Sequence, residues 1–138
     1  MGNKLEYREG WQLLNALEEH CGIYYDFLAC WDSPNENYHK FRARKLSAYA
    51  EFFEDTVKDK EENDLRINIL ELADFMKETI STFKLIQFGK REFSREEIVQ
   101  KNERLRKEYN ELLEKKIRPT YKELEKQLGV DLKRERAR

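Results

Sequence analysis

Apolar side chains recur every three or four residues over most of this chain, which is the spacing of one face of an α-helix. The first such stretch covers residues 5–31, and only Gly10 and Gly22 within it disfavour a helix. Its apolar positions are Tyr7, Trp11, Leu14, Leu17, Cys21, Tyr24, Leu28 and Trp31. The pattern predicts one long helix at the start of the chain.

Two further stretches have the same spacing, and residues typical of helix ends separate them. Ser33, Pro34 and Glu36 suit the cap, the first turn and the capping box of a second helix, which fades in the charged residues 58–63. A third helix is expected from Asn63 or Asp64 to just before Gly89. The two apolar faces consist of Tyr38, Phe41, Leu46, Tyr49, Phe52, Phe53 and Val57, and of Leu65, Ile69, Leu72, Ala73, Met76, Ile80 and Phe83.

The fourth stretch has a clear start and an interruption. Ser94 and Glu97 have the spacing of a capping box. Pro119 lacks a backbone donor and crowds the preceding turn, so it should kink or break the helix. We therefore predict an all-α fold, a bundle of about four long antiparallel helices, with the fourth kinked or broken at Pro119. Residues 1–130 form the single helical-bundle domain, and residues 131–138 form a basic flexible C-terminal tail.

The end of the first helix carries more apolar side chains than one face can use. Between residues 23 and 31 they point nearly all round the helix axis, and Asp26 is the one clear polar break. Such a segment lies either in the middle of the bundle or against a second protein. In the second case the anchors of the interface are Tyr24, Tyr25, Phe27, Leu28 and Trp31.

Composition favours a cytoplasmic protein. Charged residues make up 40% of the chain and hydrophobic residues 39%, which is enough for a core in 138 residues. No apolar run approaches the ~20 residues that span a bilayer, and no signal peptide precedes the first helix. Cys21 and Cys30 lie too far apart on one helix for a disulfide, so we expect reduced thiols and no membrane partner.

The sequence has few motifs typical of catalysis, cofactor binding or metal binding, which predicts a non-enzymatic protein without cofactor or metal. No phosphate-binding loop and no catalytic signature is found. Glu36 and His39 have the spacing of one half of a di-metal site, but no second such pair accompanies them. His20 and Cys21 are neighbours in sequence, and their side chains diverge by ~100° on a helix.

Basic residues gather toward the C-terminus. Residues 1–89 carry a net charge of −6 and residues 90–138 a net charge of +5, so the two parts of the chain attract each other or the basic end reaches an acidic partner. Residues 119–130 also resemble the first helix and turn of a helix-turn-helix DNA reader, although Glu125, Glu135 and Arg138 replace small or apolar residues of that motif. The best candidates for phosphate contacts are Lys133, Arg134, Arg136 and Arg138 in the tail.

Together these features predict a protein-protein interaction module: a small intracellular adaptor, regulator or inhibitor that acts through an aromatic-rich helical surface. Its partner is another protein or a second copy of the chain. The alternative is a nucleic-acid-associated factor that uses the basic C-terminal arm.

Overall fold

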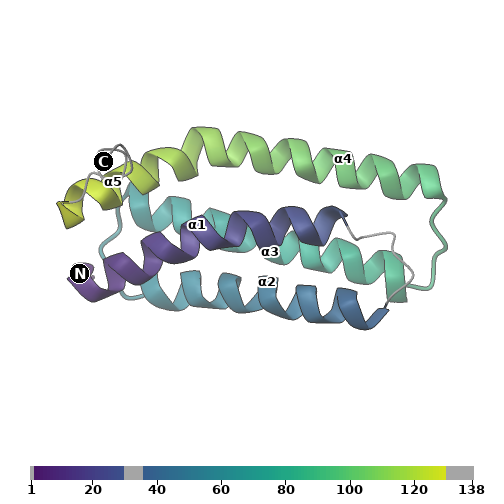
Figure 1. Cartoon of the computed structure of the whole chain (residues 1–138), viewed down its shortest axis with the longest axis horizontal. Coiled ribbons are helices and arrows are strands. Elements are labelled where there is room, and N and C mark those ends of the chain that lie inside the picture. Colours follow the sequence, from purple (N-terminus) through teal and green to yellow (C-terminus); the bar gives the residue numbers. More distant parts are fainter. Residues whose placement is uncertain (1, 30–35, 130–138) are drawn as a thin grey trace, which may run out of the picture.

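The structure is a computed structural model that describes residues 2–29 and 36–129, with side chains from residue 40 onward in the second part. It is a bundle of long helices, as the sequence predicted (Figure 1). The helices are α1 (Tyr7–Ala29), α2 (Glu36–Val57), α3 (Asp64–Phe88) and α4 (Arg95–Leu112), followed by the short π-helix η1 (Leu113–Ile117) and by α5 (Arg118–Leu128). Within these residues the only β-type pairing is one isolated bridge between Asn3 and Lys60.

The predicted cap residues begin α3 and α4. The Asn63 side chain accepts a hydrogen bond from the Arg66 backbone N–H at 3.0 Å. At α4, Ser94 and Glu97 form the complete capping box, in which each side chain accepts from the backbone N–H of the other residue. Each cap satisfies amide groups that have no partner inside the helix.

The predicted interruption of the fourth helix at Pro119 takes the form of a π-turn in the residues that directly precede the proline. In the π-turn of η1 the Arg118 N–H donates to the Leu113 carbonyl, five residues back, and Pro119 then lies in the first turn of α5. Since proline cannot donate to the carbonyl four residues back and its ring crowds that group, a widened turn at this point relieves the conflict. Figure 1 shows α4, η1 and α5 in succession along one side of the bundle.

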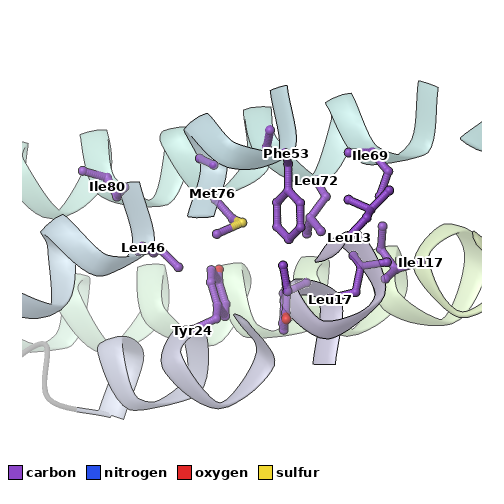
Figure 2. Close-up of a cluster of buried hydrophobic side chains, with 14 of the residues drawn as sticks. Leu13, Leu17, Tyr24, Leu46, Phe53, Ile69, Leu72, Met76, Ile80 and Ile117 are labelled. Carbon is purple, nitrogen blue, oxygen red and sulfur yellow. The ribbon is translucent and has the colours of Figure 1, made fainter. Parts of the chain in front are cut away.

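The core lies between α1, α2, α3 and the succession α4, η1 and α5, and Figure 2 labels Ile117 of η1 among its side chains. Leu13, Leu46, Ile69, Leu72 and Met76 are fully buried. All five lie in helices predicted above. Leu46, Ile69, Leu72 and Met76 also lie on the predicted apolar faces, so the spacing of apolar residues predicted the buried side of these helices correctly. In the part of the chain that the structure describes, no helix is both long and apolar enough to cross a membrane.

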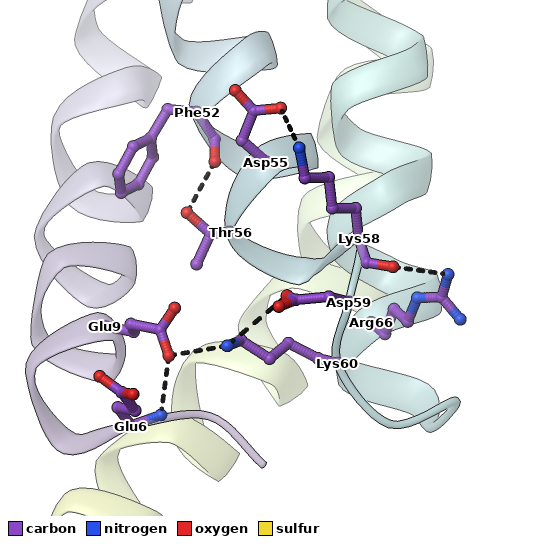
Figure 3. Close-up of polar contacts among 9 residues, drawn as sticks. All are labelled: Glu6, Glu9, Phe52, Asp55, Thr56, Lys58, Asp59, Lys60 and Arg66. Carbon is purple, nitrogen blue, oxygen red and sulfur yellow. Dashed lines mark hydrogen bonds and ion pairs between the residues drawn. The ribbon is translucent and has the colours of Figure 1, made fainter. Parts of the chain in front are cut away.

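The N-terminal residues are tied to the α2–α3 connection (Figure 3). The Asn3 N–H donates to the Asp59 carbonyl at 2.9 Å, and the Glu61 N–H donates to the Asn3 carbonyl at 3.0 Å. Lys60 Nζ lies 2.8 Å from Glu9 Oε1, and this hydrogen bond lowers the pKa of the Glu9 carboxyl. The contact holds the start of α1 against the far end of α2.

Candidate functional site: the contact between α1 and α4

The aromatic residues predicted as interface anchors are mostly core residues. Tyr24 and Phe27 have no exposed surface, and Leu28 is 2% exposed. These three side chains are therefore not available to a partner in this structure, which corrects the prediction for them: the apolar excess of α1 packs inside the bundle. Tyr25 is half-buried, and Trp31 lies outside the described residues.

These anchors do form a helix-binding surface, but its occupant is the chain itself. The Tyr24 ring stacks on Tyr109 of α4 with a centroid distance of 3.9 Å, and Phe27 contacts Phe83 of α3 edge-on at 5.0 Å. The Tyr25 hydroxyl donates a hydrogen bond to the Asn110 side chain. The extra aromatic residues of α1 thus contact both α4 beside it and α3 across the core.

A buried histidine lies at the centre of this contact. His20 has no exposed surface, and its Nδ1 lies 2.6 Å from the Leu17 carbonyl. Since a carbonyl only accepts, Nδ1 must carry the proton, and Nε2 then accepts from the Tyr109 hydroxyl at 2.8 Å. Burial lowers the pKa of His20 from 6.5 to about 4. The neutral imidazole is therefore the form that this site accommodates at neutral pH.

A second buried hydroxyl pair extends the network toward α3. The Thr79 hydroxyl donates to the Phe75 carbonyl at 3.0 Å, so it accepts from the Tyr24 hydroxyl, which is also 3.0 Å away. Burial raises the pKa of both Tyr24 and Tyr109. The buried side chains of His20, Tyr24, Thr79 and Tyr109 are thus all hydrogen-bonded, which avoids the cost of leaving them unsatisfied.

Cys21 borders the same network but shows no activation. Its Sγ lies 3.8 Å from His20 Nε2 and 3.9 Å from Nδ1, so it faces the imidazole ring and is not aligned with one nitrogen. Burial raises the pKa of the thiol, and the Tyr109 hydroxyl opposes that shift more weakly. The group is therefore held as a thiol and not as the reactive thiolate.

The remaining candidates from the sequence fall outside what the structure places. Among the described residues no three His, Cys, Asp or Glu side chains gather as metal ligands. The side chains of Glu36 and His39, the whole of Cys30 and the tail residues Lys133, Arg134, Arg136 and Arg138 lie outside the described part.

Sequence reasoning missed the partners of His20. A signal was present, because His20 lies between Leu17 and Tyr24 on the apolar face of α1, where a polar ring needs a buried partner. The identity of that partner depends on helix packing: Tyr109 is 89 residues away in the chain.

One exposed apolar pair remains on the surface. Leu85 is 61% exposed and Phe88 is 60% exposed, and both lie in the last turns of α3. Three residues apart on a helix, they are neighbours on one face. The other large exposed apolar side chains of the described part are Tyr7, Phe41, Ile67 and Val99.

No protein-family model matches this chain, and neither the curated proteins nor the solved structures contain a significant match.

Proposed function

We propose that this protein is a non-enzymatic interaction module, a small adaptor, regulator or inhibitor, and that it contacts a partner protein through Leu85 and Phe88. The observation that carries the proposal is the exposure of this pair, 61% and 60%, at adjacent positions on α3. Isolated exposed apolar residues are ordinary, whereas an adjacent leucine and phenylalanine offer a compact anchor.

The surroundings of the pair support a protein partner. On the same outer side of α3 lie the exposed polar residues Ser81 and Lys84, so the apolar anchor has a polar rim. An i, i+3 pair on a rigid helix matches recognition by an apolar groove in a partner. The absence of catalytic motifs from the sequence and the protonated state of Cys21 favour binding over catalysis.

Three helical cations that the nucleic-acid alternative could use are paired with carboxylates. Arg104, Arg118 and Lys116 each lie within ion-pair distance of a glutamate, at Glu108, Glu114 and Glu71 respectively. These ion pairs partly neutralise the positive charge of the three side chains. That alternative rests on the tail residues and stays a prediction.

Replacing Leu85 and Phe88 together by glutamine should weaken partner binding at least tenfold, because both anchors of the apolar pair are lost. The partner is first captured with the wild-type chain from its source cells, identified by mass, purified and titrated against each variant by calorimetry. The double variant should keep the wild-type helical circular dichroism, since exposed substitutions change stability by about 0.5 kcal/mol or less.

Ile67→Gln is the matched control. Ile67 is 51% exposed on the same helix and lies about five turns before Leu85, hence on the same face. This variant should bind like the wild type. Equal affinity of the wild type, the double variant and the Ile67 variant for every captured protein would refute the proposed surface.

A further inference from the structure

Helix α4 lies on α1 and α3 much as a bound helix lies in a groove. The Tyr109 ring is its anchor: it stacks on Tyr24 of α1 at 3.9 Å and lies nearly parallel to Phe75 of α3 at 6.2 Å. Leu105, one turn earlier, is also fully buried. The aromatic surface predicted from the sequence as a docking site is the floor of this groove.

Helix α4 buries few side chains against α1 and α3. Of its 18 residues only Leu105 and Tyr109 are buried, whereas α1 buries nine and α3 buries eight. Burial of apolar area is the dominant force that holds helices together. Helix α4 therefore has less holding it to the bundle than α1 or α3 has, and η1 and α5 after it add Ile117, Thr120 and Leu124 as buried residues.

Hydrogen bonds supply much of the remaining attachment. The Asn102 amide donates to the Leu28 carbonyl at 2.8 Å, Tyr109 donates to His20, and Tyr25 donates to Asn110. Water replaces such bonds when the helix leaves, so each contributes only about 0.5–1.5 kcal/mol. These hydrogen bonds fix the position of α4 but add little to the free energy that holds it.

The connection that precedes α4 is suited to a hinge. Residues 89–94 form no helix, and Gly89 ends α3 with φ −73° and ψ 161°, an extended backbone conformation. Everything after this hinge, α4, η1 and α5, follows along one side of the bundle as a single arm (Figure 1). One change of backbone direction at the hinge would therefore carry the whole arm away from α1 to α3.

Charge complementarity identifies the partner of the open form. Residues 1–89 carry a net charge of −6, residues 95–129 carry ten Lys or Arg against eight Asp or Glu, which gives +2, and the Lys116–Glu71 ion pair joins the two parts. We propose that the arm of residues 95–129 is exchangeable, and that a second copy of this chain docks its own arm into the groove formed by α1 and α3. The contacts between the arm and the rest of the closed chain are then remade between copies, which makes exchange a low-cost route to a dimer.

Cross-linking across the groove tests the proposal on the complete chain. Ala29 and Glu103 are exposed and line the same groove between α1 and α4. A variant with Ala29→Cys and Glu103→Cys, and with Cys21→Ser and Cys30→Ser to remove other thiols, is concentrated to about 1 mM, warmed to its unfolding midpoint, cooled and fractionated by size. A flexible bis-maleimide is then added to each fraction.

The expected result is a dimer at twice 16.8 kDa whose cross-links join two chains, beside a monomer whose cross-links stay within one chain. No dimer after this treatment, or a dimer with cross-links only inside each chain, would overturn the proposal.

A hinge variant provides a second, independent test. Replacing residues 89–94 by the six helix-forming residues AEAAKA joins α3 and α4 into one helix that cannot fold back on itself. A folded protein of this sequence should be entirely dimeric by light scattering, whereas the control hinge GSGSGS should leave it monomeric. A folded AEAAKA monomer would contradict arm exchange.

The exchange is independent of the surface at Leu85 and Phe88. The Leu85→Gln, Phe88→Gln variant should exchange arms as the wild type does. A chain that exchanges arms but binds no partner refutes only the proposed function, and a chain that binds a partner but never exchanges refutes only this inference.

Discussion

Replacing Tyr109 by alanine should destabilise the protein by about 4 kcal/mol, the largest effect that we expect from one substitution. Tyr109 has no exposed surface and its ring is stacked on Tyr24, so truncation leaves a cavity between α1, α3 and α4. Its hydroxyl is also the hydrogen-bond donor to His20 Nε2. Urea denaturation followed by circular dichroism measures the loss, which is a large share of the ~5–15 kcal/mol typical of a domain.

Tyr109→Phe is the matched control for this variant. It keeps the ring and its stacking but leaves His20 Nε2 without a donor, so we expect a loss of about 1–2 kcal/mol. The difference between the two variants isolates the packing of the ring. Equal losses for the alanine and phenylalanine variants would show that the ring does not fill the groove as described.

Acid should weaken the fold through His20, by up to about 3 kcal/mol between pH 6.5 and pH 4. The folded-state pKa of His20, about 4, lies below its ordinary value of 6.5, so in this range the unfolded chain binds a proton that the folded chain does not. The stabilising contribution is therefore complete above pH 6.5 and is lost as the pH falls toward 4. The groups that face the imidazole are Tyr109, Cys21, the Phe53 ring and the Leu17 carbonyl, and none supplies a negative charge at this pH.

The measurement compares the free energy of unfolding at pH 7.5 and pH 4.5 for the wild type and for His20→Gln. Glutamine keeps an amide donor and an acceptor but does not titrate in this range. Between these two pH values the free energy of unfolding of the wild type should fall by the larger part of the His20 contribution, in addition to any loss from carboxylates. The free energy of unfolding of the variant should fall only by the loss from carboxylates. Identical losses in both proteins would show that His20 is not the acid-sensitive group.

Much of the fold was predictable because helices are local structures. The three-to-four spacing of apolar residues predicted all the long helices, and the cap residues Asn63, Ser94 and Glu97 marked two starts where the structure has them. The interruption near Pro119 also follows from local chemistry, since a missing donor disturbs the turn before it. Only the form of the interruption, a π-turn over Leu113–Ile117, depends on tertiary structure, because α5 after it must pack against α1 and α3.

The candidate site was only half predictable. The sequence indicated that residues 23–31 of α1 carry too many aromatic side chains for one helix face, which is correct. It could not decide between core and interface, because that depends on how many neighbours surround α1. The structure places Tyr24 against Tyr109 and Phe27 against Phe83, so both are core residues.

The sequence by itself determined the helices, the starts of α3 and α4 and the uneven distribution of charge, because each depends on residues within a few turns of one another or on simple counts. The tertiary structure alone decided that His20 meets Tyr109 across 89 residues, that α4 is held by two buried side chains and several hydrogen bonds, and that Leu85 and Phe88 stay uncovered. The physical reason is that burial is a property of the assembled bundle. A side chain is removed from water only when another helix packs against it, and no local sequence pattern specifies which helix that is.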